Sequence, residues 1–406
     1  MKQSPNKKDK ENKQSCFKIL AKDKKTKART GFIKTKSGTV QTPFFMPVAT
    51  KTAVKYITSL DLKEMNCNAV ISNTFILHLR PGEHLIKELG GIKKFMNFKG
   101  MNVTDSGGFQ MYSPSLYISS NEKGVEFKDP FENKKVFITP EKDMQIQLDL
   151  NSDIAMCLDT MPLIEHSKAQ VKLAIERTTQ WARRCKHEHS RIQISKKIKQ
   201  DKRQLLWGII QGGIHEDLRK ISSQELTAIG FDGYSIGGLA LGETIEQEMK
   251  MIEVCKKFIP EDKPVYLMGA GNPIELLEAI SRGVDMFDSR FPTQNARHAT
   301  ILTSQGKLRL DRKIYEKDQS PLDKNCDCKV CKNFTRAYIR YQLKQQEAVG
   351  MHLASYHNLY YLQNLMQQAR TAIKEGKFLE FKNKIKKIYQ TADKNIKKTT
   401  SKVKKK

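Results

Sequence analysis

Short apolar segments recur along the chain, and most end at a polar residue or a glycine. They show no regular alternation of apolar and polar positions, which is typical of strands buried on both faces of a sheet. Seven such segments stand out, at 69–72, 103–105, 153–158, 205–210, 234–236, 265–268 and 284–287. Directly after them, or shortly beyond, stand Asn73, Ser106, Asp159, Gln211, Gly237, Gly269 and Asp288. The pattern predicts parallel strands whose carboxyl ends carry polar groups.

Amphipathic helical stretches lie between these segments. Apolar residues recur at spacings of three and four from Ile245 to Phe258, and Pro260 ends that pattern. Asn272 is a suitable N-cap for a further helix, and Pro273 fits its first turn. Repeated strand–helix units predict a (β/α)8 barrel, whose catalytic groups sit at the carboxyl ends of the strands. A doubly wound sheet is the alternative, although no G-x-G-x-x-G motif opens a helix here.

The segment around Asp105 is the clearest candidate for chemistry. A short β-prone approach delivers this carboxylate, and Ser106-Gly107-Gly108 follows at once. Glycines at such a turn allow a ligand to approach the backbone closely. A plain strand-to-loop turn, with the Asp accepting backbone N–H bonds, explains this segment alone equally well. Repetition of the arrangement at other strand ends favours a ligand site.

Size and cysteine content limit the class of protein. With 406 residues, the chain can form one barrel and a small additional unit. No apolar run reaches the roughly 18 residues of a transmembrane helix, and the first residues lack the apolar core of a signal peptide. The eight cysteines are too dispersed for a disulfide scaffold. We therefore expect a soluble protein of the reducing cytoplasm, without a membrane partner.

The charge balance is strongly basic. Lys and Arg total 72 against 44 Asp and Glu, a formal net charge of +28. This excess favours a polyanionic partner such as nucleic acid, although a generally Lys-rich composition with solvated side chains gives the same count. Ten of the first 28 residues are Lys, and seven Lys lie between 394 and 406. We expect 1–28 and 391–406 to be disordered basic segments, with the barrel spanning 29–390.

Three cysteines crowd into one short segment, as Cys326, Cys328 and Cys331. Thiolates this close are most simply explained by a tetrahedral Zn²⁺, which needs a fourth ligand. His352 and His357 follow in a helical stretch, and His357 is the better candidate because apolar residues beside it can form a buried face. A Cys3His set is closed, so we expect one structural Zn²⁺ per chain, in a subdomain of about residues 320–360. Three incidental loop cysteines are the alternative.

With these pieces assembled, the chain resembles the tRNA-guanine transglycosylases (queuine tRNA-ribosyltransferases), in their bacterial, single-module form. The resemblance covers roughly residues 31–361 and rests on motifs in a fixed order. They are G-T-V-Q-T-P at 38–43, N-T at 73–74, L-R-P-G at 79–82, T-D-S-G-G-F-Q at 104–110, I-T-P-E at 138–141, S-D-I at 152–154, Q-G-G at 211–213, G-G-L-A-L-G-E at 237–243, Y-L-M-G at 266–269, D-M-F-D at 285–288 and P-T at 292–293. Any one motif is weak, but the ordered series is specific.

The resemblance implies base exchange in the anticodon loop of tRNA. Guanine at the wobble position of G-U-N anticodons would be replaced by a 7-deazaguanine base. Breaking an N-glycosidic bond through an oxocarbenium-like state favours a carboxylate nucleophile that traps C1′. The resemblance gives this role to Asp288 and the role of proton acceptor to Asp105. It also implies that Asn73 positions Asp288.

The base pocket is likewise implied by the resemblance. The matching positions are Asn73, Ser106, Phe109, Asp159, Gln211, Gly238, Leu239, Ala240 and Met268. Asp159 would accept from the N–H edge of the base, while Gln211 and Gly238 would meet its carbonyl. Phe109 and Met268 would form apolar walls on either side of the ring. Leu239, Ala240 and Glu243 would form the turn that meets the 7-substituent.

The chain departs from the usual family pattern at several positions. Met161 and Ser289 stand where Cys is common. Two Arg usually read the anticodon loop after Pro-Thr, but this chain has Gln294 and then Arg297, which weakens a phosphate contact there. Leu241 stands where queuine-inserting eukaryotic enzymes have Gly. Together with Met161 it narrows the pocket, which favours 7-aminomethyl-7-deazaguanine over queuine.

Alternative functions stay open on the sequence alone. One is a queuine-inserting salvage enzyme. Another is a non-catalytic tRNA-binding subunit of the same family, although such a subunit can lose its carboxylates and this chain has both Asp105 and Asp288. A barrel hydrolase unrelated to RNA would need a metal-binding His/Asp set at the strand ends, and the sequence has none. Active members of the family are generally homodimers, and we expect the same here.

Overall fold

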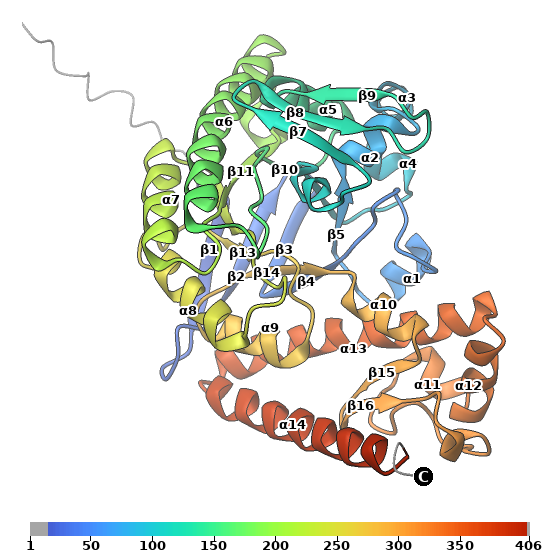
Figure 1. Ribbon diagram of the computed structural model, residues 1–406. Coiled ribbons are helices and arrows are strands. Elements are labelled where there is room, and N and C mark those ends of the chain that lie inside the picture. The colour runs from blue at the N-terminus through green and yellow to red at the C-terminus, as the bar shows by residue number, and fades with distance from the viewer. Residues whose placement is uncertain (1–14, 404–406) are drawn as a thin grey trace, which may run out of the picture.

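The computed structural model describes residues 15–403, including their side chains except for Phe109 and residues 395–403. Its centre is a barrel of eight parallel strands with helices around it (Figure 1). In order around the barrel the strands are β4 (Phe44–Pro47), β5 (Ala69–Asn73), β6 (Met101–Asp105), β10 (Ile154–Met156), β11 (Leu205–Ile210), β12 (Gly233–Ile236), β13 (Val265–Leu267) and β14 (Met286–Ser289). Strand β14 pairs with β4, and a bridge from Val48 to Ile71 links β4 to β5. The predicted (β/α)8 class is confirmed.

Strand β4 is the one that the apolar pattern did not indicate. It has four residues, all buried, and prolines stand at 43 and 47. So short a segment between prolines has the composition of a loop, since Pro lacks the N–H that a central strand needs. Each of the other seven strands overlaps one of the predicted segments.

The helices cover the outside of the barrel and build the C-terminal part of the chain (Figure 1). Their bounds are α1 (Ser59–Glu64), α2 (Thr74–Leu79), α3 (Glu83–Glu88), α4 (Ile92–Phe95), α5 (Pro140–Leu150), α6 (Lys168–Ser195), α7 (Glu216–Ile229), α8 (Ile245–Lys256), α9 (Pro273–Ile280), α10 (Phe291–Arg297), α11 (Lys329–Asn333), α12 (Arg336–Lys344), α13 (Ala348–Lys374) and α14 (Phe378–Val403). Asn272 caps α9 and Pro273 opens it, as predicted. Helix α8 ends before Pro260, also as predicted.

An antiparallel sheet closes the amino end of the barrel. Its strands are β1 (Phe17–Lys22), β2 (Arg29–Thr35) and β3 (Gly38–Thr42). Phe17 and Ile33 join the apolar cluster inside the barrel, next to Trp207. Arg29 of β2 forms a buried ion pair at 2.6 Å with Asp285, just before β14. The sheet therefore covers the end of the barrel opposite the carboxyl ends of the strands.

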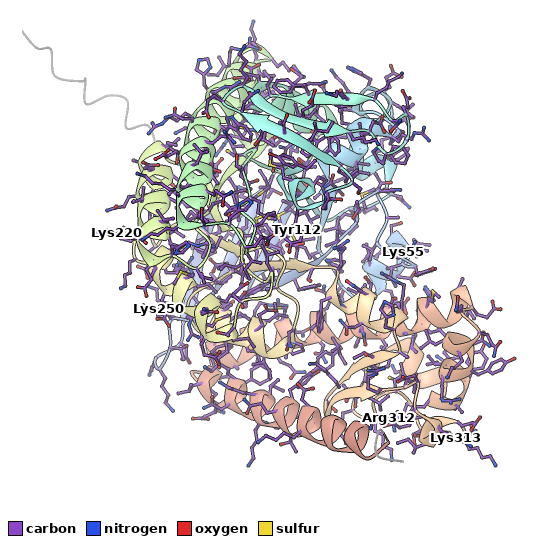
Figure 2. All side chains as sticks on the ribbon, viewed as in Figure 1. Lys55, Tyr112, Lys220, Lys250, Arg312 and Lys313 are labelled. Atoms are coloured by element: carbon purple, nitrogen blue, oxygen red, sulfur yellow. The ribbon has the colours of Figure 1, made fainter. Side chains whose placement is uncertain are left out.

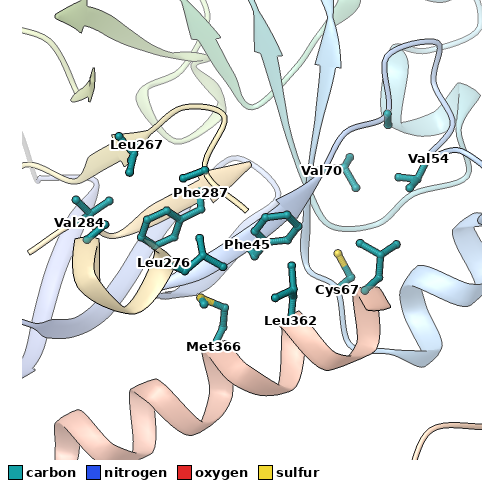
Figure 3. Close-up of a cluster of buried hydrophobic side chains, with 14 of the residues drawn as sticks. Phe45, Val54, Cys67, Val70, Leu267, Leu276, Val284, Phe287, Leu362 and Met366 are labelled. Carbon is teal, nitrogen blue, oxygen red and sulfur yellow. The ribbon is translucent and has the colours of Figure 1, made fainter. Parts of the chain in front are cut away.

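A second apolar core lies between the barrel and its helices. Phe45 of β4 and Phe287 of β14 point outward toward Leu362 and Met366 of α13 (Figure 3). The helix thus packs along the barrel wall between β4 and β14. It also carries His357, so the wall packing fixes the place of the predicted metal ligand.

Parts of both basic segments that we expected to be disordered form regular secondary structure. Residues 17–22 of the expected N-terminal arm form β1, because Phe17 packs into the barrel core. Residues 1–14 lie outside the described part of the chain. At the other end α14 continues to Val403, so the tail expected from 391 is helical up to that residue. The buried side chains of Phe378 and Tyr389 anchor α14, and the Lys-rich segment continues this helix because Lys is a good helix former.

Two further sheets flank the barrel. The connection from β6 to α5 holds the 3-10 helix η2 (Gly108–Tyr112) and the sheet β7 (Tyr117–Asn121), β8 (Gly124–Lys128) and β9 (Lys135–Ile138). The hairpin β15 (Thr300–Thr303) and β16 (Gly306–Arg309) precedes α11, and two short 3-10 helices are η3 (Gln200–Lys202) and η4 (Lys313–Tyr315). Over the described residues, no helix is both long and apolar enough to cross a membrane.

Candidate active site and metal centre

A cavity of about 410 Å³ opens at the carboxyl ends of the barrel strands. Most of the predicted site residues line it, namely Asn73, Asp105, Ser106, Asp159, Gln211, Gly238, Leu239, Ala240, Met268, Asp288 and Gln294. They come from distant parts of the chain and meet because parallel strands end on one rim. Three carboxylates therefore share one cavity.

Asp105 ends β6, and both of its carboxylate oxygens accept hydrogen bonds. Gly107 N donates to Oδ1 at 2.6 Å, and Asn73 Nδ2 donates to Oδ2 at 2.8 Å. Burial raises the pKa of Asp105 to about 6; these hydrogen bonds oppose the shift, and the charges of Asp159 and Asp288 add to it. The carboxyl group can therefore gain and lose a proton near neutral pH.

Asn73 holds Asp105, and the expectation that it positions Asp288 was wrong. It ends β5, where it pairs with Asp105 across the sheet. Its Oδ1 caps α2 by accepting from Ile76 N at 2.8 Å, and its Nδ2 also donates to Gln110 Oε1 at 3.0 Å. Strand β5 adjoins β6, whereas β4 separates it from β14. The contact follows from the barrel order, in which β5 and β6 are neighbours, whereas the assignment to Asp288 came from the family resemblance.

Asp288 lies in β14 with one carboxylate oxygen held. The Tyr266 hydroxyl donates to Oδ1 at 2.5 Å, and Gly269 N donates to the same atom at 3.0 Å. No described residue forms a hydrogen bond to Oδ2 in the structure. Burial raises the pKa of Asp288, while the two donors and the charge of Arg290 oppose that rise. The arrangement fixes the carboxylate and leaves one oxygen available for attack.

Asp159 and Gln211 form a buried pair in the same cavity. Gln211 Nε2 donates to Asp159 Oδ2 at 2.6 Å, and Ser106 Oγ donates to Oδ1 at 3.2 Å. Burial raises the pKa of Asp159 to about 6. Gln211 Oε1 is buried and has no partner among the described residues. A Cβ on Gly238, where φ is 64°, would lie 2.3 Å from that oxygen, so only Gly fits beside it.

The turn at 237–243 lines the cavity from Gly237 to Leu241. Glu243 accepts from Ala240 N at 2.5 Å and from Leu241 N at 3.0 Å, which fixes the turn. Ala240 has a φ of 60°, a left-handed conformation that is rare without Gly. Leu241 and Met161 both line the cavity. The two residues that we expected to narrow the pocket are therefore part of its wall.

Of the remaining predicted residues, some line the cavity and others do not. Met268 lines the cavity, whereas the side chain of Phe109 lies outside the described part of the structure. Gln294 is exposed on α10 at the edge of the cavity. Arg297, on the same helix, is partly buried and is not among the lining residues.

The four predicted metal ligands come together at one point. The ligand atoms of Cys326, Cys328, Cys331 and His357 all lie within 4.8 Å of one another. His357 Nδ1 is 3.8, 3.6 and 3.3 Å from the three sulfurs in that order, close to the ~3.5 Å expected when three thiolates and one imidazole share a tetrahedral ion. The other ring nitrogen, Nε2, donates to Leu302 O at 2.8 Å and so turns Nδ1 toward the cysteines. His352 instead contacts Tyr56 O. The group can hold a metal ion.

Comparison with known proteins identifies the family. The family description "Queuine tRNA-ribosyltransferase" matches residues 23–391. The chain belongs to the queuine tRNA-ribosyltransferase family. Proteins named queuine tRNA-ribosyltransferase from Halothermothrix orenii and Desulforamulus reducens are 46% and 45% identical over 373 residues, which covers 92% of this chain and 97% and 98% of theirs. One from Staphylococcus aureus is 46% identical over 359 residues, or 88% of this chain and 92% of its own.

Membership of the queuine tRNA-ribosyltransferase family confirms the resemblance drawn from the motifs, and with it the prediction that the chain is an enzyme. Sequence reasoning missed Tyr266, the hydroxyl that holds Asp288. Tyr266 opens the motif at 266–269, but its position within an apolar strand gave it the appearance of a core residue. The signal that could have found it was its strand's place beside the strand of Asp288, because adjacent barrel strands bring side chains of one layer into contact.

Proposed function

We propose that this enzyme is a tRNA-guanine transglycosylase. It would exchange guanine at the wobble position of G-U-N anticodons for 7-aminomethyl-7-deazaguanine, as a step of queuosine biosynthesis. The observation that carries the proposal is one cavity with two kinds of carboxylate. Asp105 and Asp288 line the cavity, where they would serve as a proton-handling group and a nucleophile, and Asp159 lies buried with Gln211, where the two would recognise the base.

In the first displacement, Oδ2 of Asp288 attacks C1′ of the nucleotide. A bond forms between that oxygen and C1′ while the bond from C1′ to N9 breaks, and the electron pair leaves with guanine. Guanine accepts a proton at N9, which the carboxyl group of Asp105 can supply because its pKa is raised to about 6. The Tyr266 hydroxyl keeps the attacking group in place through Oδ1.

The second displacement reverses these steps with the new base. The carboxylate of Asp105 removes the proton from N9 of the incoming 7-deazaguanine. That nitrogen attacks C1′, the ester bond to Asp288 breaks, and its electron pair returns to the carboxylate. Protons and charge balance over the cycle, so no additional reactant is needed.

Base recognition follows from the buried pair. The carboxylate of Asp159 can accept the amino and ring N–H groups on one edge of a guanine-like base. Backbone N–H groups at Gly238 and Leu239, together with the amide of Gln211, would face its carbonyl side. Leu241 and Met161 bound the cavity where the 7-substituent would lie, which supports the small aminomethyl group over the cyclopentenediol of queuine.

Exposed cations near the cavity support tRNA as the partner. Lys51 follows Thr50, a lining residue, and its Nζ lies 5.3 Å from the ring centre of Phe131. Arg80 lies 4.4 Å from the same ring. Lys55 is exposed further along the same loop (Figure 2). With Gln294 and Arg297 on α10, these side chains can meet the anticodon loop and its phosphates.

For the Cys3His group we propose one structural Zn²⁺. The donor set is closed and soft, and its distances suit tetrahedral coordination. Bound there, zinc would fix the C-terminal helices to the barrel wall. We also propose a homodimer, because Tyr338 and Tyr341 of α12 expose 41% and 58% of their surface on the metal-binding subdomain.

The test of the proposed function is exchange of radiolabelled guanine into tRNA by the wild type and by Asp288→Asn and Asp105→Asn. Both variants should be inactive, and Asp288→Asn should also lose any tRNA adduct that survives a denaturing gel. Asp143→Asn is the control, since Asp143 is buried and its pKa is raised well above the ordinary value, so the neutral amide mimics it. A wild-type protein that binds tRNA without exchanging guanine would favour the non-catalytic subunit.

A further inference from the structure

Arg219 on α7 is fully buried and makes no ion pair with the described residues, although the charge of Glu243 acts on it from a distance. Its guanidinium instead donates to backbone carbonyls. Nε donates to Gly213 O at 2.9 Å, and Nη1 to Ile210 O at 2.9 Å and Gly237 O at 2.8 Å. Nη2 donates to Gly238 O at 3.3 Å. Burying an unpaired charge is costly, so a fold that keeps one at this place has a use for it.

The four carbonyls belong to the end of β11, to the turn after it and to the turn after β12, and those of Gly237 and Gly238 come from residues that line the cavity. One turn follows β11 and carries Gln211; the other follows β12 and carries Gly238. The guanidinium therefore ties together the carboxyl ends of two adjacent strands at the base pocket. A Cβ at Gly212 would lie 2.8 Å from the backbone N of Arg219, so the first turn also packs closely on α7.

The hydrogen bonds from Arg219 also set the direction in which the N–H groups of the second turn point. In a trans peptide the C=O of one residue and the N–H of the next point in opposite directions. Because Arg219 holds the carbonyls of Gly237 and Gly238, the N–H groups of Gly238 and Leu239 are turned away from it. Both residues line the cavity, and neither N–H has a hydrogen-bond partner among the described residues. Two adjacent donors are thus left for a ligand.

We propose that Arg219 is a positioning residue for the base pocket, which holds the Gly238 and Leu239 N–H groups ready for the carbonyl oxygen of the purine-like base. Its charge also favours the negative charge that the leaving base acquires when the glycosidic bond breaks. The inference rests on the proposed function, because it takes these donors to meet the base. A purely structural Arg219 would stabilise the strand ends without affecting the base.

Arg203 provides a matched control. It precedes β11 and so lies at the opposite end of the same two strands. It pairs with Asp232 through both terminal nitrogens, at 2.8 and 2.5 Å. The carboxylate of Asp232 also accepts from Leu206 N. Removing this Arg should lower stability through a lost ion pair but leave the cavity unchanged.

The experiment compares Arg219→Gln, Arg219→Lys and Arg203→Gln with the wild type. Guanine binding without tRNA is measured by equilibrium dialysis, tRNA binding by filter retention, and folding by thermal unfolding. Losing aligned donors should weaken guanine binding by about 10- to 100-fold in Arg219→Gln, with tRNA affinity within about 2-fold of the wild type. Arg219→Lys keeps the charge but cannot donate to all four carbonyls, so its guanine affinity should lie between those of Arg219→Gln and the wild type. Arg203→Gln should melt earlier and bind guanine normally.

Unchanged guanine binding in a folded Arg219 variant would overturn the inference. The inference would also fail if Arg219→Gln and Arg219→Lys both unfold, because Arg219 would then serve only to stabilise the fold. If the wild type binds guanine but exchanges none, the proposed transglycosylation is refuted. The positioning role is then decided by comparing guanine binding of the Arg219 variants with that of the wild type in the dialysis. Wild-type protein that binds no guanine would refute both.

Discussion

The Tyr266 hydroxyl donates a 2.5 Å hydrogen bond to Oδ1 of Asp288 from the adjacent barrel strand. Burial raises the pKa of Tyr266 well above its ordinary value, so the phenol stays protonated and acts as a donor. Gly269 N reaches the same oxygen, which leaves Oδ2 for the substrate. A fixed orientation of this kind is what a carboxylate nucleophile needs in order to attack in line.

Replacing Tyr266 by Phe should slow guanine exchange. The carboxylate loses its short hydrogen bond, so its pKa, already raised by burial, rises further. The nucleophile must be ionised, and activity is lost as pH falls through this pKa. The acid limb of the kcat/KM profile should therefore move to higher pH, and kcat at pH 7 should fall by about 10- to 100-fold.

Tyr234→Phe is the control for this change. Tyr234 is buried on β12 and its hydroxyl accepts from Phe231 N, away from the cavity. Its loss should affect stability but leave the acid limb in place. If the acid limb does not move in Tyr266→Phe, Asp288 does not depend on this hydroxyl.

The meeting of three carboxylates in one cavity could be predicted from sequence because of how a barrel is built, whereas their proposed roles come from the family resemblance. Asp105 and Asp288 lie at the carboxyl ends of their strands and Asp159 lies shortly after its strand, and parallel strands bring such positions to one rim. The metal ligands were predictable for a similar reason, since three lie within six residues. The fourth candidate ligand, His357, is distant in the sequence and was chosen over His352 because apolar residues beside it can form a buried face.

Contacts that depend on which elements become neighbours could not be predicted in this way. The family resemblance assigned Asn73 to Asp288, but β5 adjoins β6 in the barrel, and Asn73 donates to Asp105 instead. Arg219 has no motif of its own, and only the packing of α7 on β11 and β12 reveals its carbonyl partners. Strand β4 was missed because it has only four residues, starting just after Pro43 and ending at Pro47, and its burial comes from the closed barrel and from α13.

Asp159→Asn should stabilise the protein while abolishing guanine binding. Burial raises the pKa of Asp159 to about 6, so the folded state binds this proton more tightly than the unfolded chain. Ionisation therefore costs stability; the cost is absent below about pH 4 and complete above about pH 6. The neutral amide removes the cost, and the amide of Gln211 can turn to accept from it.

The free energy of unfolding of Asp159→Asn should exceed that of the wild type by about 1–3 kcal/mol at pH 8, and by about half as much at pH 5. Urea unfolding at the two pH values measures this. Asp149→Asn, which removes a buried carboxylate paired with Lys87 at 2.8 Å, should show no gain. Equal stability of Asp159→Asn and the wild type at pH 8 would contradict the raised pKa.

Loss of the metal should affect the fold before it affects the chemistry. Cys328→Ser should abolish the close to one equivalent of Zn²⁺ expected from metal analysis and lower the unfolding free energy by on the order of 5 kcal/mol. Guanine exchange should fail through instability and weak tRNA binding. Cys255→Ser, in a buried cysteine of α8, should retain the metal. A stable, metal-free and fully active Cys328→Ser variant would rule out a structural zinc.

The inserted base should be decided largely by Leu241. Its side chain and Met161 line the cavity next to the turn expected to meet the 7-substituent. Overpacking the ring of queuine against such walls costs about 1–3 kcal/mol, or roughly 5- to 150-fold in kcat/KM. Leu241→Gly should shift the preference toward queuine by a factor in this range, whereas the volume-conserving Leu241→Met should not.

Competition between 7-aminomethyl-7-deazaguanine and queuine on one tRNA with a G-U-N anticodon measures the preference directly. The wild type should favour the aminomethyl base, because a small ammonium group needs an acceptor more than it needs room. Met is flexible and can move aside, so Leu241 carries most of the discrimination. If the wild type uses queuine with an equal or higher kcat/KM, the cavity walls do not select against the ring, and the chain is a salvage enzyme.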